Sequence, residues 1–187
     1  MIIKPPLDSA SVSKVLKSSK RILILGAPGS GKSYWGEWLH RKLGHSLISL
    51  DHYYWKPNWQ PADLESFANV CSELAQGDCW IMEGNFGSTF EGRWARADLV
   101  IYLDPSPWLS FWRQVLRAIG MGKRVQRPKE CPEWRGFKAL GQLFWLTYKF
   151  RGAHGVLISK HMREKFPEVP FYRAADLAQI YQLTVNR

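Results

Sequence analysis

The segment from Gly26 to Ser33 carries the residue spacing that is most directly tied to a chemistry in this sequence. It reads Gly26-Ala27-Pro28-Gly29-Ser30-Gly31-Lys32-Ser33, a full match to the phosphate-binding pattern G-x-x-x-x-G-K-[ST]. In this pattern the glycines let backbone N–H groups turn toward phosphate oxygens, the lysine reaches the terminal phosphates, and the hydroxyl can ligate Mg²⁺. The segment lies between an apolar run and an amphipathic stretch, so we expect it to bind ATP with Mg²⁺.

Three acidic residues come directly after apolar runs that we predict to be strands: Asp51, Glu83 and Asp104. Ligands of parallel sheets bind beyond the carboxyl ends of the strands. A phosphotransferase needs one carboxylate to organise Mg²⁺ and another to orient or deprotonate the acceptor hydroxyl. We expect Glu83 and Ser33 at the metal and Asp51 at the acceptor, with the reverse division between the two carboxylates left open. Asp104 is expected to cap the next helix.

A dense aromatic stretch lies directly after Asp51, where an acceptor pocket would open. Its rings can stack on a base, a sugar or another flat group, or they can serve only as core packing, and the sequence favours neither. An asparagine and an arginine that follow Glu83 are expected near the same sheet edge, the arginine to position the acceptor. The residues predicted to bind the acceptor are Asp51, Tyr54, Trp55, Trp59, Asn85 and Arg93.

Basic residues are concentrated in one third of the chain. Residues 104–165 hold 13 Arg or Lys and four Asp or Glu, a net charge of +9 within a total of +10. Arg113 and Arg117 lie one i, i+4 step apart on a predicted helix, and Arg124 and Arg127 follow in a Gly-containing loop. We expect a mobile lid in which Arg113 and Arg117 contact ATP while Arg124 and Arg127 neutralise the transferred phosphoryl group. The alternatives are a solvated basic face and a surface for nucleic acid or anionic lipid.

Short apolar runs alternate with longer amphipathic stretches along the chain, which is typical of α/β domains. The predicted strands are Arg21–Leu25, Ser46–Leu50, Cys79–Met82, Leu99–Leu103 and Val169–Tyr172. The predicted helices are Lys32–Leu43, Ala62–Ala75, Pro107–Ile119, Ala139–Phe150, Gly155–Phe166 and Ala174–Tyr181. We expect an α/β, P-loop NTPase fold of the nucleotide-kinase-like type, a three-layer sandwich with a five-stranded parallel sheet and a helical, basic lid.

The length of 187 residues suits one domain, which we place at 21–187 with a lid insertion at about 117–136. Residues 1–20 are expected to form a loose or short helical extension ahead of it. The longest apolar runs are far shorter than the ~20 residues of a membrane-spanning helix, so no membrane partner is expected. The first residues lack the apolar region of a secretory signal, which favours the cytoplasm. Three cysteines without a C-x-x-C pair indicate free thiols.

Several short blocks beyond the phosphate-binding loop stand at a characteristic spacing: Leu50-Asp51, Tyr54-Trp55, Pro57, Trp59, Trp80-Ile81, Gly84-Asn85, Arg93, Ala97-Asp98, Leu103-Asp104, Arg113 and Arg117. In these blocks, over roughly residues 21–150, the chain resembles adenylate-kinase-related P-loop proteins of the DNA topology modulation protein family. Members usually have Asp where this chain has Glu83, and often Thr where it has Ser33. The resemblance implies an ATP-binding, kinase-like fold with a basic lid after the fourth strand, and it leaves the acceptor open.

Together these features predict a kinase that transfers the γ-phosphoryl group of ATP to a small acceptor, with nucleosides and nucleotides among the candidates. The predicted catalytic residues are Lys32, Asp51, Arg124 and Arg127, and the chain is expected to be a monomer or a homodimer. The alternative is a nucleotide-gated DNA- or RNA-binding protein that uses residues 104–165, which is less favoured because no nucleic-acid-binding consensus is present. A third interpretation is slow ATP hydrolysis without an acceptor.

Overall fold

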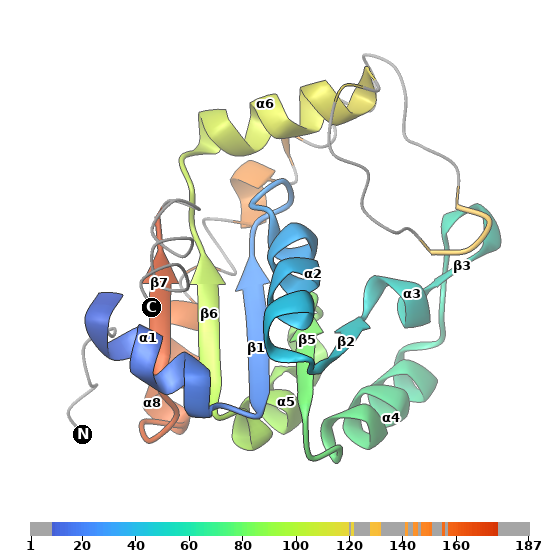
Figure 1. Ribbon diagram of the computed structural model, residues 1–187. Helices are drawn as coiled ribbons and strands as arrows, with labels where there is room; N and C mark the ends of the chain where they lie inside the picture. Colours follow the sequence, from blue (N-terminus) through green and yellow to red (C-terminus); the bar gives the residue numbers. More distant parts are fainter. Residues whose placement is uncertain are drawn as a thin grey trace.

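A five-stranded parallel sheet forms the centre of the computed structural model, which describes residues 9–119, 121, 128–131, 141, 144–145, 147–150, 155 and 157–175 (Figure 1). Its strands run in the order β2-β5-β1-β6-β7, and every neighbouring pair is parallel. The strands are β1 Arg21–Gly26, β2 Ser46–Ser49, β5 Trp80–Glu83, β6 Leu99–Leu103 and β7 Phe171–Ala174. The predicted five-stranded parallel sheet is therefore confirmed, with β1 at its centre.

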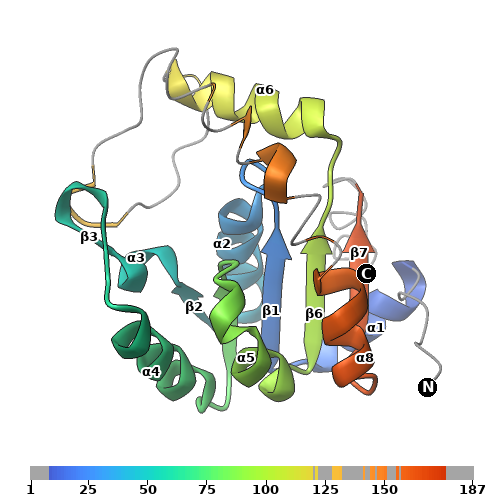
Figure 2. The ribbon, with the colours of Figure 1, turned by 180° about the vertical axis from the view of Figure 1, so that it is seen from behind.

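Helices cover both faces of the sheet, as Figures 1 and 2 show from opposite sides. The helices are α1 Ser9–Ser18, α2 Lys32–Leu43, α3 Asp51–Tyr54, α4 Leu64–Ala75, α5 Phe90–Arg96, α6 Pro107–Ala118 and α8 Arg163–Lys165, the last preceded by a π-helix at Leu157–Met162. α1 and α2 lie on one face, α4, α5 and α8 lie on the other, and α6 crosses above the carboxyl ends of β1 and β6. The three-layer α/β arrangement agrees with the fold expected from the sequence.

The core has two halves because successive side chains of β1 point to opposite faces of the sheet. Leu23 and Leu25 belong to a cluster that includes Phe67 of α4 and Trp94 of α5. Their neighbours Ile22 and Ile24 belong to the other half, in which α1 and α2 supply apolar side chains. A central strand buried on both faces explains why Arg21–Leu25 reads as a continuous apolar run rather than as an alternating one.

The segment ahead of the first strand forms a helix that packs on the domain where the structure describes it. Helix α1 buries Val12 and Leu16 in the same half of the core as Trp35 and Leu39 of α2. Ser19, which follows α1, accepts a hydrogen bond at its carbonyl from Nε2 of His45 at 2.9 Å. The expected extension therefore contains a helix that packs as part of the domain.

Several predicted boundaries shift, and some short elements lack a sequence signal. The last strand lies two residues later than expected, so that Ala174, predicted to start a helix, instead ends β7, and 176–181 lie outside the described residues. The helix predicted at 139–150 is described at 141, 144–145 and 147–150, all helical. Helix α5 and the hairpin of β3 Trp55–Lys56 and β4 Gln60–Pro61 were not predicted, because the seven residues of α5 are too few to show a helical period and the two residues of each hairpin strand too few to show a strand pattern.

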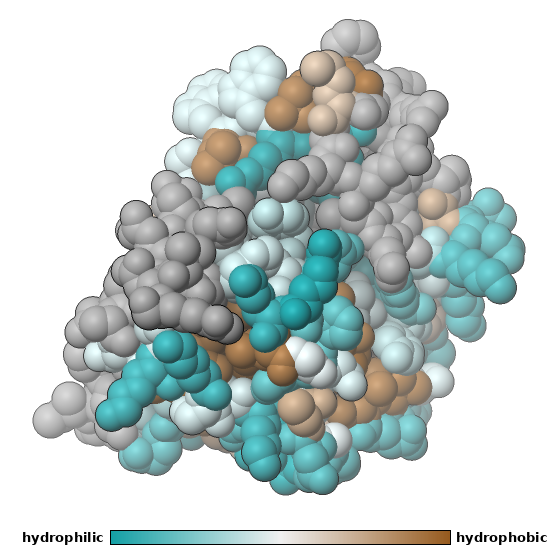
Figure 3. Space-filling model, viewed as in Figure 1, coloured by the Kyte–Doolittle hydropathy of each residue, from teal (hydrophilic) through white to brown (hydrophobic). Residues whose placement is uncertain are grey.

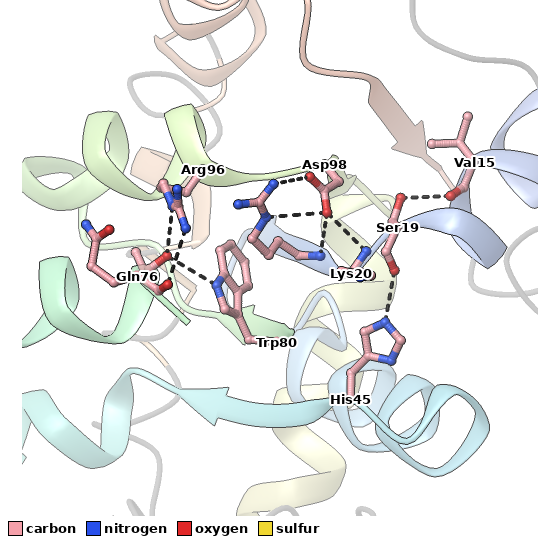
Figure 4. Close-up of polar contacts among 10 residues, drawn as sticks. Val15, Ser19, Lys20, His45, Gln76, Trp80, Arg96 and Asp98 are labelled. Atoms are coloured by element: carbon pink, nitrogen blue, oxygen red, sulfur yellow. Dashed lines mark hydrogen bonds and ion pairs between the residues drawn. The ribbon is translucent and has the colours of Figure 1, made fainter. Parts of the chain in front are cut away.

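At the amino ends of the strands, away from the phosphate-binding loop, polar side chains form hydrogen bonds with backbone groups (Figure 4). Asp98 accepts hydrogen bonds from the backbone N–H groups of Lys20 and Arg21 at 3.0 and 2.9 Å, and it pairs with the Arg21 guanidinium at 2.7 Å. Arg96 donates to the carbonyl oxygens of Ala75 and Gln76 at 3.3 and 3.2 Å. Arg96 and Asp98 therefore stabilise the fold at the edge away from the phosphate-binding loop.

Replacing Asp98 with asparagine should lower the free energy of unfolding at neutral pH by about 1 kcal/mol, because a charged acceptor of several hydrogen bonds is lost. Burial by itself would raise the pKa of Asp98, but hydrogen bonds from Arg21 and from the backbone of Arg21 and Lys20 bring that pKa below its ordinary value. This stabilisation is present above the ordinary carboxyl pKa and is lost as pH falls through the lowered folded-state pKa. Urea unfolding should show a difference between the two proteins that shrinks on acidification; a difference independent of pH would contradict this assignment.

Candidate functional site

The phosphate-binding loop connects β1 to α2, as its sequence pattern requires. Gly26 has φ 150°, and a Cβ there would lie 2.4 Å from the carbonyl oxygen of Leu103. Gly29 has φ 77°, and a Cβ there would lie 2.4 Å from the carbonyl oxygen of Ser110. These two positions accept only glycine, because the loop needs both a left-handed backbone and close contact with its neighbours.

Asn85 anchors the start of this loop. Its Oδ1 accepts from the N–H of Gly26 at 3.2 Å, and its Nδ2 donates to the carbonyl of Gly26 at 2.9 Å. The side-chain amide of asparagine can accept from the N–H and donate to the C=O of the same residue, as it does here with Gly26. The structure therefore places Asn85, predicted to bind the acceptor, as a positioning residue for the loop.

The inner face of α6 holds the other side of the loop. Gln114 donates from Nε2 to the carbonyl of Pro28 at 3.3 Å, and Arg113 donates from Nη1 to the carbonyl of Ser30 at 3.1 Å. Among the described residues, Ser30 Oγ and Gln114 Oε1 are buried polar atoms without a hydrogen-bond partner. Such atoms carry an energetic cost unless a ligand or water satisfies them. The Ser30 hydroxyl can donate to a phosphate oxygen, whereas Gln114 Oε1 is an acceptor and needs a donor such as water.

Lys32 begins α2 and folds back over the loop. Its Nζ donates to the carbonyls of Gly26 and Ala27 at 2.8 and 3.2 Å. Burial lowers the pKa of Lys32, while the nearby charges of Glu83 and Asp51 raise it. A partly desolvated ammonium held by backbone carbonyls can exchange these contacts for phosphate oxygens, which suits the role predicted for Lys32.

Glu83 ends β5 deep in the site and is only 2% exposed. Its Oε1 accepts from Ser33 Oγ at 3.2 Å and from Ser49 Oγ at 2.5 Å. Burial raises the pKa of Glu83 and Asp51 raises it further, whereas Lys32 and the two hydroxyls lower it. Ser49 was missed by sequence reasoning, although its place at the end of β2, two residues before Asp51, was a usable signal.

Hydroxyl and carboxylate oxygens meet at Ser33 and Glu83, which is the donor set that Mg²⁺ prefers. Within the described part of the chain, no group of three or more His, Cys, Asp or Glu is placed to hold a metal ion. Mg²⁺ in nucleotide sites commonly keeps several waters and takes one or two protein ligands together with substrate phosphates. The residues present therefore fit the magnesium ion that the sequence predicts.

Asp51 is the first residue of α3 and lies next to Glu83 through the pairing of β2 with β5. The N–H of Leu50 donates to the carbonyl of Glu83 at 3.0 Å, which brings Asp51 to the carboxyl edge of the sheet. Burial raises the pKa of Asp51, and the charges of Lys32, His52 and Arg117 lower it. Lys32, Glu83 and Asp51 are thus close enough for their charges to shift one another's pKa values, and they meet where the sequence predicted. The charge of Arg117 in α6 also lowers the pKa of Asp51.

The aromatic residues after Asp51 divide into two roles. Tyr54 packs against Phe67 and Phe86, with ring centroids 5.0 and 4.7 Å apart, and belongs to the edge of the core. Trp55 and Trp59 lie on the β3–β4 hairpin with their rings 5.7 Å apart and are half-buried. Packing therefore accounts for Tyr54, and Trp55, whose ring lies 4.8 Å from that of Tyr54, connects this cluster to Trp59 on the hairpin.

Arg93, predicted to position the acceptor, is bonded to backbone groups in the structure. It is fully buried in α5, and its guanidinium donates to four backbone carbonyls, those of Gly84, Asn85, Phe86 and Thr89, at 2.8–3.2 Å. Burial lowers the pKa of Arg93 to about 10, so the group stays charged at neutral pH. Its donors are committed to the loop between β5 and α5, and it acts on the site by holding Asn85.

The described part of the predicted lid contacts the hairpin that carries the tryptophans. The N–H of Asn58 donates to the carbonyl of Glu130 at 3.1 Å, and Cys131 Sγ donates to the carbonyl of Lys56 at 3.3 Å. Arg124 and Arg127 lie outside the described residues, so their predicted catalytic roles stay predictions. The structure thus brings two predicted regions, lid and aromatic segment, into contact.

The predicted helix cap after β6 is Ser106 rather than Asp104. Ser106 accepts from the N–H of Leu109 at 3.2 Å, which is the N-cap contact of α6. Asp104 pairs with Arg173 of β7 instead. Sequence spacing did not distinguish the two residues, because both can accept a hydrogen bond at a helix start.

Two solved structures share this fold over most of the chain. Shikimate kinase from Acinetobacter baumannii in complex with shikimate has a TM-score of 0.55 and 17% identity, covering 91% of this chain and 92% of that chain. Shikimate kinase from Bacteroides thetaiotaomicron has a TM-score of 0.52 and 16% identity, covering 89% and 94%. No family model and no curated protein matches the sequence. The likeness establishes the P-loop kinase fold, and it does not confirm the DNA topology modulation protein family.

Proposed function

From this fold and site we propose that the protein is a Mg²⁺-dependent phosphotransferase that moves the γ-phosphoryl group of ATP to a hydroxyl of a small acceptor. The observation that carries the proposal is the meeting of Lys32, Glu83 and Asp51 beside a complete phosphate-binding loop. Such a site needs a cation for the phosphates, oxygen ligands for the metal and a carboxylate for the acceptor. Each requirement has a residue of its own here.

In the proposed mechanism, backbone N–H groups of the loop and Lys32 bind the β- and γ-phosphates. Ser33 and Glu83 would hold Mg²⁺, which when bound supplies positive charge to the phosphate oxygens. The acceptor oxygen forms a bond to the γ-phosphorus while the bond from that phosphorus to the ADP oxygen breaks. Asp51 takes the proton of the acceptor hydroxyl, and the raised pKa of Asp51 makes it a better base than an ordinary carboxylate.

The nature of the acceptor is constrained by what surrounds Asp51. Trp55 and Trp59 offer flat apolar surface, which favours an acceptor with a ring. Arg93 is committed to backbone carbonyls, so an anionic acceptor would need its cation from elsewhere, such as Arg117 or the predicted lid arginines Arg124 and Arg127. Cyclic polyols and nucleosides are therefore our leading candidates, and shikimate, bound by one structural neighbour, belongs in the same test.

The experiment that tests the proposal measures Mg²⁺-dependent ADP release from ATP across nucleosides, nucleotides, cyclic polyols, shikimate and oligonucleotides. An acceptor that raises ADP release well above the rate without acceptor, and that gains a phosphate by mass spectrometry, supports the proposal. A protein that binds ATP but is stimulated by no acceptor, and whose affinity for oligonucleotides changes with ATP and salt, would be a nucleotide-gated binding protein instead.

Replacing Asp51 with asparagine should lower kcat about 10²-fold while the dissociation constant for ATP changes less than about threefold, because the base acts only on the acceptor proton. Isothermal titration with ATP and steady-state ADP release measure the two quantities separately. Asp104→Asn is the matched control, since Asp104 lies at the same sheet edge but is held by Arg173. Equal losses of ATP affinity and turnover in Asp51→Asn would assign Asp51 to the metal and nucleotide rather than to the acceptor.

A further inference from the structure

Helix α6 has its polar face inward and its apolar face outward. Ser110 and Gln114, one i, i+4 step apart, are only 1% and 2% exposed and lie against the phosphate-binding loop. On the other side, Trp108 is 67% and Ile119 is 60% exposed. Spacings of four, four and three residues place the exposed Trp108, Trp112, Leu116 and Ile119 on one face. A helix that covers a core normally has the opposite arrangement.

A second segment continues this surface. Phe144 packs its ring edge-on against Phe111 of α6 at 5.4 Å, and Gln114 donates to Thr147 Oγ1 at 2.9 Å, so the two segments lie side by side. Together they expose nine large apolar side chains, which we call the outer apolar face: Trp108, Leu109, Trp112, Leu116, Ile119, Met121, Phe144, Trp145 and Tyr148. Figure 3 shows brown, tan and pale side chains along the upper edge of the molecule, where Figure 1 places α6.

We propose that the outer apolar face docks on a membrane surface that contains anionic phospholipid. A contiguous exposed apolar surface of this kind marks an interaction site. Tryptophan and tyrosine prefer the boundary between water and acyl chains, and the leucine, isoleucine and methionine side chains of this face suit the acyl region just below it. A lipid surface therefore suits both the Trp and Tyr side chains of this face and its leucine, isoleucine and methionine side chains.

The positive charge of this part of the chain favours a membrane surface with anionic headgroups. Helix α6 contains no acidic residue, and residues 104–165 carry a net charge of +9. Lys149, next to Tyr148 of the face, is exposed. Basic residues near a membrane are attracted by anionic headgroups, and the attraction weakens as salt rises. Pairing of two copies through this face would bring positive charge against positive charge, since α6 contains no acidic residue to balance Lys149.

The composition of the face also argues against nucleic acid as the main partner. Surfaces that bind single strands present aromatic rings for stacking. Four of the nine side chains here are aliphatic: Leu109, Leu116, Ile119 and Met121. Such side chains gain more from acyl chains than from bases.

Docking in this way is compatible with the rest of the molecule. No helix in the described ranges has the length and apolar character to cross a bilayer. The expectation of no membrane partner rested on that criterion, which does not apply to a helix that lies in the interface. Because the inner face of α6 contacts the phosphate-binding loop, docking through the outer face leaves that loop on the far side of α6 from the membrane.

Sedimentation with phospholipid vesicles tests the proposal, using the full chain, vesicles of phosphatidylcholine alone and vesicles of phosphatidylcholine with phosphatidylglycerol. The double variant Trp108→Ser/Trp112→Ser should lower the affinity for the anionic vesicles at least about tenfold. Leu116→Ser and Leu64→Ser form a matched pair of exposed helical leucines, since Leu64 begins α4, away from α6. Leu116→Ser should weaken binding and Leu64→Ser should not. Thermal unfolding of each variant checks that it is folded.

We expect the wild type to bind anionic vesicles, to lose binding as salt rises and to bind phosphatidylcholine alone much more weakly. Wild-type protein that stays in the supernatant at low salt, or a double variant that binds like the wild type, would overturn the proposal. Sedimentation velocity and an oligonucleotide titration on the same proteins test the two alternative partners of this face, a second copy of the chain and nucleic acid. A wild-type dimer, or an oligonucleotide complex, that the double variant loses in the absence of vesicle binding would assign the face to a second copy or to nucleic acid.

Discussion

Replacing Lys32 with alanine should lower kcat/KM for ADP release about 10³-fold, the largest loss of activity that we expect from any single substitution. Removing one preorganised charge at the phosphates costs about 10²–10³-fold in turnover, and Lys32 also contributes to ATP binding. The structure adds a reason for a large effect: the nearby carboxylates Glu83 and Asp51 would face the phosphates without a compensating cation. ADP release with the best acceptor and titration with ATP measure the two contributions.

Lys42→Ala is the matched control for Lys32→Ala. Lys42 lies in the last turn of the same helix, with its ammonium 5.7 Å from the centre of the Trp38 ring. We expect this variant to keep turnover within about twofold, because exposed cation–π contacts contribute little and lie far from the phosphates. If Lys32→Ala keeps wild-type turnover while Lys42→Ala does not, the loop is not the ATP site that we propose.

Replacing Arg93 with methionine should lower the free energy of unfolding by about 3–5 kcal/mol, the largest stability loss that we expect. The substitution keeps the length of the side chain but leaves four backbone carbonyls without their donor in a buried place. Urea unfolding measures the loss. Arg93→Lys should recover part of the stability, because an ammonium keeps the charge but cannot reach all four carbonyls.

Arg96→Met provides the comparison within the same helix. Arg96 donates to the carbonyls of Ala75 and Gln76 but is partly exposed, so water can replace it and we expect a loss of about 1 kcal/mol. The outcome that would restore the sequence prediction for Arg93 is a stable Arg93→Met protein whose KM for the acceptor rises while its affinity for ATP is unchanged. The structure predicts instead that any loss of activity follows the loss of stability.

The contacts of Asn85 and Arg93 show what the sequence could not predict, namely the hydrogen-bond partners of polar side chains near the site. Both residues follow Glu83 and belong to the predicted acceptor group, and both lie close to the site. Their donors and acceptors are nevertheless committed to backbone groups, Asn85 to Gly26 and Arg93 to the loop after β5. Sequence spacing predicts which residues reach a sheet edge, but it does not tell whether a polar side chain there faces a ligand or a neighbouring peptide.

The amino-acid sequence by itself determined those features that depend on contiguous residues or on a periodic pattern of apolar residues. The phosphate-binding loop depends on contiguous residues, and the five parallel strands depend on apolar runs separated by helices, so both were predictable. From these followed the meeting of Lys32, Glu83 and Asp51, because strands of a parallel sheet end at one edge.

Only the tertiary structure decided which face of α6 is buried. The tryptophans of α6 lie outward, because the loop beneath the helix offers carbonyls at Pro28 and Ser30 that are paired with the donors of Gln114 and Arg113. Buried carbonyls must be paired, and that requirement prevails over the burial of apolar side chains that can remain at the surface. The pairing of Ser49 with Glu83 arose in the same way, from contacts between strands that are distant in the sequence.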